Sequence, residues 1–560
     1  MLLLRNYVIA MIALFIILAL IGGINNYSPI PFWDMWDGYL DPYINFIQGD
    51  YLTLFAQHNE HRIVISKLLF FIDLHYFNGA SLFLIIVNYL LLALFALLML
   101  AYTRELSLEK SYGDHGRVII AGVILLFAVS WIQKENLTWA FQSQFFLAYL
   151  LPLFSFYALY RATETKPTLW FLLALIAGFL SAGTMANGIL ALPILFILAL
   201  VLRQSYPKLV LIAVLTLITI VLYFHQFHSN PAHGSITQTL LHTPTAFFAY
   251  ILTYIGNPFY ALFFKQLLIA QLFGLLFIAS AAYLLFKTLF QTPNDPKKAL
   301  ILSLFAFIIF IGATAFGTAG GRAIFGVEQA LSSRYATPVI FAWIALWLIA
   351  LHLFRHKLAH AKALYGALII FTIALFIVQI EAFGKETRTH FERNVAAMAL
   401  QLNAKDTDYL SKLFPSDEHL LHIAARAKQH NLSIFNAQRS AWQHHLGDEY
   451  CPTPKPGLTA HLDRTISLPD GAYKRLEGWV VDTEQQTPPT KLLILEHNTQ
   501  QIVGYALVGA KREDVAEHLA NRAFRYAGFV GYIRADASAQ LQLVEPDTRR
   551  AVELRLAPNQ

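Results

Sequence analysis

Charged residues are scarce in this chain. Asp, Glu, Lys and Arg make up 14% of its 560 residues, whereas soluble domains carry about 25%. Hydrophobic residues make up 57%, and the mean hydropathy is +0.51. This composition excludes an ordinary water-soluble protein along the whole length and indicates that much of the chain has a lipid bilayer as its solvent.

Cysteine is nearly absent, since Cys451 is the single one. One thiol excludes an internal disulfide framework, and we expect an unreactive side chain. A concentrated basic patch is also missing, because the Lys and Arg residues behind the net charge of +6 are spread between apolar runs. That spread favours membrane topology over nucleic-acid binding, so we expect a lipid bilayer and no nucleic acid as partner.

The composition changes once along the chain. Long apolar runs continue to about Phe383, and from Lys385 onward the composition is that of a soluble protein. The N-terminal apolar run lacks a convincing small-residue cleavage site, so we interpret it as an uncleaved first span. The predicted parts are a transmembrane domain (1–384), a helical segment (385–450) and a β-sandwich domain (451–560).

About 20 apolar residues cross a bilayer as a helix. The apolar runs predict an α-helical polytopic protein with about eleven spans, several of them short. They cover residues 7–24, 81–102, 118–132, 145–160, 169–186, 189–202, 209–224, 266–286, 299–316, 337–354 and 364–380.

The loop charges predict the orientation. With the N-terminus inside, fourteen Lys and Arg residues fall on the cytoplasmic side and six on the opposite side before residue 385. This asymmetry follows the positive-inside rule. An odd number of spans then places residues 385–560 outside the cytoplasm.

The predicted outer loops are long, aromatic and rich in His, Asn and Gln. They are residues 25–80, 134–144, 225–245 and 317–336. Polar groups at membrane depth cost about 2.5–3.5 kcal/mol each on insertion scales unless they line a cavity. We therefore expect these loops to fold over a shared wet cavity at the outer face.

The first acidic motif is FWDMWDGY, directly after the first span. Asp34 and Asp37, spaced by three, would share one face of a helical turn beside Trp33 and Trp36. One interpretation is a catalytic base, or an anchor for a sugar hydroxyl, with the tryptophans as a stacking wall. The alternative is an interfacial aromatic belt with an Asp cap, and we favour the functional interpretation.

A dense polar cluster precedes the next apolar run. It consists of His58, Asn59, Glu60, His61 and Arg62. His58 and His61 could bind a metal at helical spacing, but no third ligand is evident and the two-His-plus-Glu zinc pattern is absent. A hydrogen-bonding network for a polar substrate is the favoured prediction, and a solvated loop is the alternative.

The second outer loop combines amides with an aromatic ring. Its candidate substrate-binding residues are Glu135, Asn136, Trp139, Gln142 and Gln144. Amides bond hydroxyls and an aromatic ring stacks on a pyranose, so the set suits a carbohydrate. It equally suits a re-entrant turn that satisfies its own backbone.

Arginines in the last outer loop suggest a phosphate site. Arg322 follows a glycine-rich run, and Arg334 precedes Tyr335. Guanidinium binds phosphate bidentately without losing its charge. The alternative is an arginine at a span end that extends to the interface.

The tail changes its periodicity. Residues 385–430 have the Ala- and Leu-rich spacing of helices, and from about Pro452 short alternating runs are separated by Gly, Pro, Asn and Asp. This pattern predicts a compact antiparallel β-sandwich that acts as a lid, a docking module or a glycan-binding module, without catalytic residues of its own.

Several motifs together resemble one membrane family. WDMW, HNEHRI, ENLTWAFQSQFF, MANG and SRYATP are similar to motifs of bacterial proteins of the GT-C glycosyltransferase superfamily associated with surface-glycan modification and pilin glycosylation. GWVVD, KREDVA and GFVGY resemble a β-domain appended to some of them. The resemblance covers most of the membrane part.

The resemblance implies an inverting transfer from a polyprenyl-phosphate-linked sugar to a glycan or protein acceptor. It places the chain in the bacterial inner membrane with its C-terminal domain in the periplasm. It also implies that an Asp of the first outer loop is the base, with Asp34 preferred over Asp37, and that Arg322, Arg334 and Tyr335 bind the lipid phosphate. The predicted membrane part (1–384) has no DxD-type signature, so we expect no cofactor and do not favour a divalent cation.

Two other classes remain open on the sequence. A lipid-linked-sugar flippase needs polar groups along a transport path, whereas here they gather in loops on one side. A non-enzymatic envelope scaffold would use the tail to bind glycans.

Overall fold

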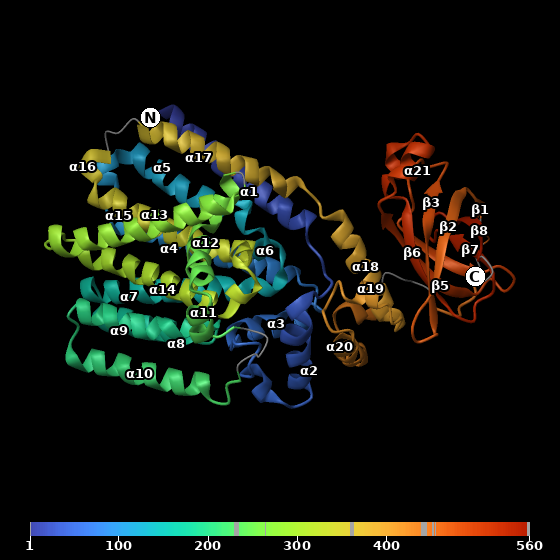
Figure 1. Ribbon diagram of the computed structural model, residues 1–560, viewed down its shortest axis with the longest axis horizontal. Helices are drawn as coiled ribbons and strands as arrows, with labels where there is room; N and C mark the ends of the chain where they lie inside the picture. The colour runs from blue at the N-terminus through green and yellow to red at the C-terminus, as the bar shows by residue number, and fades with distance from the viewer. Residues whose placement is uncertain are drawn as a thin grey trace. The chain divides into compact units, whose positions relative to one another are not determined.

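The computed structural model describes residues 2–228, 234–263, 265–358, 363–437, 445–450, 453 and 455–556 (Figure 1). Cys451 lies outside the described residues, so the prediction for its thiol is not tested. The chain divides into two compact units. Unit 1 comprises Met1–Tyr27, Asp50–Ile72 and Ser81–Lys385, and unit 2 comprises Ser28–Gly49, Asp73–Ala80 and Glu386–Gln560.

Unit 1 is helical, and most of its long helices lie alongside one another (Figure 1). They are α1 (Leu2–Asn25), α4 (Leu82–Glu105), α5 (Glu109–Ala128), α6 (Lys134–Thr138), α7 (Ser143–Glu164), α8 (Pro167–Ser181), α9 (Ala191–Val201), α10 (Tyr206–Phe224), α11 (Ile236–His242), α12 (Pro244–Leu262), α13 (Leu267–Phe286), α14 (Lys298–Arg322), α15 (Ala336–Leu353), α16 (Arg355–Leu358) and α17 (Ala363–Gln379). Helix α3 (Val64–Tyr76) begins in unit 1 and ends in unit 2.

The helices have the length and composition of membrane spans. Among the described residues, nine helical segments are long and apolar enough to cross a bilayer. Two shorter apolar helices, Pro167–Ser181 and Ala186–Val201, coincide with two of the short predicted spans. All eleven predicted runs overlap helices, so the prediction of a helical protein with many apolar helices is confirmed.

Helix α12 was not predicted, because Pro258, Asn257 and several tyrosines interrupt its apolar run. Two glycines let α12 and α13 approach closely. A Cβ at Gly256 would lie 1.7 Å from the Ala270 carbonyl oxygen, and one at Gly274 would lie 2.1 Å from the Leu252 carbonyl oxygen. Only glycine fits at either contact.

Burial separates the central helices from the peripheral ones. In the most apolar window of Ala140–Glu164, 83% of the residues are buried, against 17% for Tyr206–Phe224. Helix α7 is therefore the centre of unit 1 and α10 lies at its edge. Helices α4 and α15 meet through Phe95 and Phe341, whose rings stack with centroids 3.6 Å apart.

Unit 2 contains helices and one sheet. The helices are α2 (Asp41–Ile47), α18 (Thr387–Leu402), α19 (Thr407–Leu410), α20 (Asp417–Gln429) and α21 (Glu513–His518). The strands are β1 (Lys455–Pro456), β2 (Leu458–Ser467), β3 (Tyr473–Asp482), β4 (Lys491–Glu496), β5 (Ile502–Ala510), β6 (Gly528–Arg534), β7 (Gln540–Val544) and β8 (Arg550–Arg555).

The strand-rich tail is confirmed, but the predicted two-sheet sandwich is wrong. All eight strands form one sheet in the order β1-β8-β7-β4-β5-β6-β3-β2. Every pairing is antiparallel except that of β1 with β8. The sheet curls so that β2 comes close to β8, and a single core that includes Val480, Ile494 and Phe529 fills its concave side. Alternation along the strands predicts a buried face but does not distinguish two facing sheets from one curled sheet.

A buried ion cluster joins the helical segment of unit 2 to the sheet. Arg475 on β3 donates to Asp406 at 2.6 Å, and the Tyr532 hydroxyl on β6 donates to the same carboxylate at 2.7 Å. The side chains of Arg475 and Asp406 are 5% and 2% exposed. Because a buried charge without its partner is costly, this cluster holds the helices and the sheet together as one body.

Candidate functional site

The acidic motif of the first loop folds as two short turns of unit 2. The 3₁₀ turn η1 (Trp33–Met35) carries Asp34, and the π turn η2 (Trp36–Leu40) carries Asp37. The two carboxyl groups lie close enough for the charge of Asp34 to act on Asp37, as their spacing predicted. Trp33 has a φ of 50°, a strained conformation for a bulky residue, and π turns often occur at functional sites.

Asp37 is the perturbed acid of this pair. Burial, followed by the charge of Asp34, raises the pKa of Asp37 from 3.8 to about 7. Its Oδ1 is buried and has no hydrogen-bond partner among the described residues. A carboxyl group with a pKa near 7 and an acceptor oxygen without a partner is suited to take a proton from a hydroxyl.

The two tryptophans beside the acids have different environments. Trp36 is fully buried, and its indole Nε1 donates to the Pro31 carbonyl at 3.0 Å. The side chain of Trp33 is 46% exposed. Of the predicted stacking wall, Trp33 therefore offers a ring face to a ligand, whereas Trp36 belongs to the packing of the loop.

Other residues of unit 2, not predicted from the sequence, hold this loop in place. Arg426 on α20 forms an ion pair with Asp41 and donates to Asn45 Oδ1 at 2.6 Å. The Tyr39 hydroxyl donates to Asp73 Oδ2 at 2.6 Å, and Asp73 is fully buried. A lone Asp inside the apolar run FFIDLHYF was the available signal, because a buried carboxylate requires a partner.

The His58–Arg62 segment of unit 1 forms a turn instead of a helix. His58 and His61 pair through their backbones, with N–O distances of 2.8 and 2.9 Å, so the helical spacing considered for a metal is not present. Asn59, at the turn, has a φ of 49°. Arg62 donates to the carbonyl oxygens of Phe55, Tyr223 and His225, contacts that support a structural role.

Neighbouring groups connect this turn to other segments of unit 1. His61 Nδ1 accepts from the Ala186 backbone N–H at 3.1 Å, and the Glu60 carbonyl accepts from the Tyr223 hydroxyl at 2.6 Å. Burial, together with the charge of Lys67, lowers the pKa of His58 to about 4, so the imidazole is neutral at pH 7. Lys67 is itself 1% exposed, and its Nζ donates to two backbone carbonyls.

The second and last predicted outer loops meet in unit 1. Arg334 lies 3.5 Å from Glu135, and the Ser332 and Ser333 hydroxyls donate to Glu135 Oε2 at 3.1 and 3.4 Å. Asn136 donates to the Arg334 carbonyl at 2.8 Å. Residues separated by about 200 positions thus form one polar group, which we call the Glu135–Arg334 cluster.

Buried amides extend the Glu135–Arg334 cluster. The Asn136 amide also donates to Thr337 Oγ1 at 2.7 Å, and Thr337 donates to Gln133 Oε1 at 2.6 Å. Asn88 on α4 donates to the carbonyl oxygens of Asn136 and Trp139. Asn88, Gln133 and Thr337 were not predicted, because single amides and hydroxyls in apolar runs carry no spacing signal.

Gln142 is the least satisfied polar side chain of this region. It is fully buried, and neither of its amide atoms has a hydrogen-bond partner among the described residues. Gln144 Oε1 is also buried without a hydrogen-bond partner among the described residues. The ring of Phe141, between them and Trp139 in the chain, lies 5.5 Å from that of His58. Buried polar atoms without partners are unusual and indicate a place for a polar ligand or water.

Arg322 and Tyr335 lie around a second polar group. The Tyr250 hydroxyl on α12 donates to Gln329, whose Nε2 donates to the Tyr335 hydroxyl at 3.3 Å. Arg322 and Arg334 both lie within electrostatic reach of the Tyr250 hydroxyl. The three predicted phosphate-binding residues therefore all act on Tyr250, the two arginines through their charges and Tyr335 through Gln329. Tyr250 was not predicted, because it lies on the helix that the sequence analysis missed.

For a metal ion, unit 2 offers Asp34 and Asp37. Mg²⁺ is commonly held by one or two carboxylates together with substrate phosphate oxygens and water. Asp34 and Asp37 supply the two carboxylates, and a phosphate of the substrate would supply the remaining protein-independent ligands. The same two acids are therefore compatible with a catalytic base and with a metal site.

No protein-family model, curated protein or solved structure matches the chain. Function is therefore argued from the geometry of these groups.

Proposed function

We propose that this chain is a bacterial glycosyltransferase of the GT-C type, anchored in the inner membrane by its apolar helices. It transfers a sugar from a polyprenyl-phosphate donor to a cell-surface glycan or to a protein such as pilin. The reaction takes place on the periplasmic face, and the C-terminal domain lies in the periplasm. The stereochemistry at the anomeric carbon is inverted.

The environment of Asp37 carries this proposal. Its carboxylate takes the proton of the acceptor hydroxyl while that oxygen attacks the anomeric carbon, and the bond from this carbon to the phosphate oxygen breaks. The polyprenyl phosphate leaves with the electron pair of that bond. The sequence favoured Asp34 as the base, but the raised pKa and the open oxygen of Asp37 favour Asp37, with Asp34 adjusting its pKa.

The leaving phosphate requires positive charge. We assign this role to Arg334 and Arg322, because both approach Tyr250 and Tyr335 lies beside it. A guanidinium binds a phosphate through two parallel hydrogen bonds and stabilises the charge that develops on departure. Glu135 lies 3.5 Å from Arg334 and helps to position it. Gln142, Gln144 and Trp139 remain candidates for binding the sugar.

The test is transfer by the purified full-length chain in lipid nanodiscs, from a series of polyprenyl-phosphate sugars to the native acceptor. Mass analysis of the glycans and pilins of a deletion strain identifies the acceptor first. Asp37→Asn should lower the rate by about 10²–10⁴-fold, the usual contribution of a general base. Asp114→Asn, at an exposed position of α5, is the matched control and should transfer like wild type.

Two results would count against this assignment. Near-wild-type turnover in Asp37→Asn and in Asp34→Asn would remove the base from this motif. Loss of turnover in EDTA, restored by Mg²⁺ or Mn²⁺, would make the two acids metal ligands. If no polyprenyl-linked sugar serves as donor, the flippase and scaffold alternatives replace the enzyme.

A further inference from the structure

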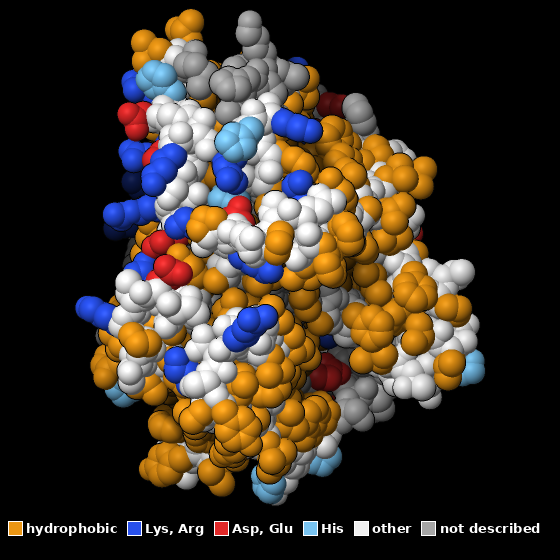
Figure 2. Space-filling view, turned by 90° about the vertical axis from the view of Figure 1, so that its left-hand side faces the viewer, with side chains coloured by type: hydrophobic (Ala, Val, Ile, Leu, Met, Phe, Trp, Pro, Cys, Tyr) orange, Lys and Arg blue, Asp and Glu red, His pale blue; other side chains and the backbone are white. Residues whose placement is uncertain are grey.

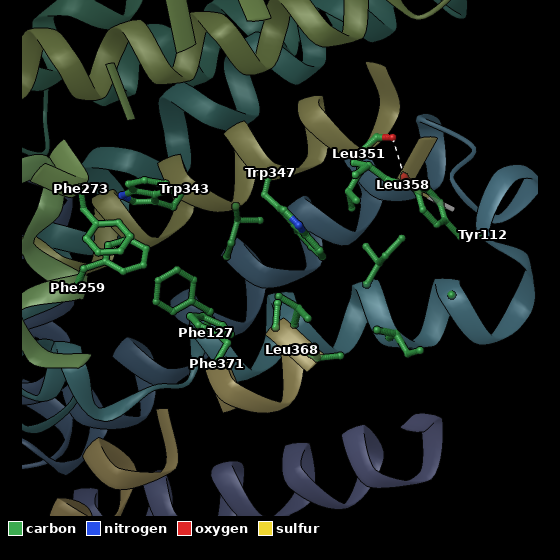
Figure 3. A pocket seen from close by; sticks show the side chains of 16 residues that line it. Tyr112, Phe127, Phe259, Phe273, Trp343, Trp347, Leu351, Leu358, Leu368 and Phe371 are labelled. Atoms are coloured by element: carbon green, nitrogen blue, oxygen red, sulfur yellow. Dashed lines mark hydrogen bonds between the residues drawn. The ribbon is translucent and has the colours of Figure 1, made fainter. Parts of the chain in front are cut away.

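An apolar cavity of about 410 Å³ lies among helices α5, α12, α13, α15 and α17 of unit 1. Figure 3 shows Phe259 and Trp343 at one end, Trp347 in the middle, and Tyr112 and Leu358 at the other end. The volume is within the range of about 300–1,000 Å³ that is usual for small-molecule sites. Among the residues that line the cavity, only Tyr112 has a hydroxyl, and it already donates a hydrogen bond to the Leu351 carbonyl. The wall is therefore apolar, and the cavity favours a hydrocarbon occupant.

The cavity lies away from the end of α15 at which Arg334 is found. Helix α15 begins at Ala336, and Trp343 lies seven residues further on, about 10 Å along the axis. Leu351, whose carbonyl accepts from the Tyr112 hydroxyl at 2.9 Å, lies about 22 Å from the start of the helix. A head group at the Tyr112 end would therefore lie about 22 Å, along the axis of α15, from the end of the helix at which Arg334 is found.

The Tyr112 end of the cavity is basic. Arg117 follows a lining glycine of α5, Lys357 precedes the lining Leu358, and both are exposed. Arg355 lies within electrostatic reach of the Tyr112 hydroxyl. Figure 2 looks onto the side of the molecule where α16 lies in Figure 1, and Lys and Arg side chains are distributed over it.

The two acids named near this end offset part of that charge. Asp295 is 6% exposed and is already bound by His352, at 3.0 Å, and by Arg355. Asp114 is exposed one turn before Arg117. Arg117, Arg355 and Lys357 together with these two acids leave a net positive charge near the Tyr112 end of the cavity, which lies among helices with the composition of membrane spans.

We propose that this cavity holds an acyl chain of an anionic phospholipid whose phosphate lies among Arg117, Arg355 and Lys357. Basic pockets between membrane helices bind anionic lipid head groups, and the adjoining apolar cavity accommodates the chain. The lipid is a bound component of the helical unit. This inference depends on the membrane location of the helices and not on glycosyl transfer.

The test uses the tryptophans in the cavity wall as reporters. The full-length chain is placed in phosphatidylcholine nanodiscs that contain rising fractions of phosphatidylglycerol with dibrominated acyl chains, which quench tryptophan fluorescence on contact. We expect a saturable decrease at low fractions of the brominated lipid. Val123→Phe fills the cavity and should abolish it, whereas Val118→Phe, on α5 but not in the wall, should retain it. Replacing Trp343 and Trp347 by Phe should remove the saturable signal.

The head-group contact is tested by charge removal. The double variant Arg117→Gln and Lys357→Gln should raise the half-saturating fraction several-fold, whereas Arg203→Gln, in the turn between α9 and α10, should not change it. Quenching that grows in strict proportion to the fraction of brominated lipid would mean bulk contact only. Equal quenching by brominated phosphatidylcholine would overturn the anionic specificity. Displacement by a polyprenyl phosphate at low fractions would assign the cavity to the carrier lipid and defeat the proposal.

Discussion

The ionisation of Asp37 makes the pH dependence of transfer a sharp test. With a pKa of about 7, the base is half ionised at pH 7, and below that the rate should fall about tenfold for each pH unit. Asp34→Asn removes a neighbouring negative charge, which is the second cause of the raised pKa. The acidic limb of kcat/KM should therefore move to lower pH in that variant while the plateau stays measurable.

The same shift has a consequence for stability. The pKa of Asp37 in the folded protein lies above 3.8, its ordinary value, so the protonated carboxyl contributes stability that is complete below pH 3.8. This contribution is lost as the pH rises toward about 7. Three pKa units at about 1.4 kcal/mol each correspond to an upper limit of about 4 kcal/mol. The Asp37→Asn variant has no carboxyl at this position to ionise, so it does not lose this stability as the pH rises. It should therefore transfer sugar slowly and yet be more stable than wild type at pH 8.

The assay combines transfer rates between pH 5 and pH 9 with thermal unfolding of the purified protein over the same range. The difference in melting temperature between Asp37→Asn and wild type should be small near pH 4 and largest at pH 8. If the acidic limb of kcat/KM lies at the same pH in Asp34→Asn as in wild type, the coupling of the two acids is refuted. Equal pH dependence of stability in Asp37→Asn and wild type would show that the carboxyl is solvated and unsuited to the proposed role.

Three further predictions follow from other contacts. Arg334→Gln should raise the KM for the donor more than it lowers kcat, because it removes a phosphate partner, and an unchanged KM would exclude that role. Asp406→Asn should destabilise the C-terminal domain by about 1–3 kcal/mol, since Arg475 loses one charged partner and keeps Asp408 and Glu477, and limited proteolysis of the full chain measures this. A reporter fused after Lys298 should be cytoplasmic and one at Gln560 should be outside the cytoplasm, whereas a cytoplasmic C-terminus would reverse the predicted topology.

Some contacts of the candidate site could be predicted as neighbours and others could not. The pairing of Asp34 with Asp37 follows from their spacing, because residues three apart share one side of a turn. The contact of Glu135 with Arg334 joins two predicted site residues, but their partnership depends on how helices of unit 1 pack. Tyr250 could not be predicted, because its helix contains residues that are uncommon in spans.

The metal interpretation of His58 and His61 illustrates a limit of spacing arguments. The sequence analysis considered these two residues on a helix, whereas here they pair across a turn closed by backbone hydrogen bonds, and His61 Nδ1 accepts from the Ala186 N–H. The curled sheet illustrates the same limit for strands. Alternation predicts which residues are buried, whereas the partner of each strand depends on contacts between residues distant in the chain.

The sequence by itself determined the properties that depend on local composition. The apolar runs, the loop charges, the helical segment after residue 385 and the strand periodicity beyond it can be read within windows of about 20 residues. Tertiary structure alone decided that Ser28–Gly49 packs with the C-terminal part, through Arg426 and Asp41, and that the Asp37 carboxyl is buried. These features depend on burial and on charges brought together from distant positions, and a pKa responds to both.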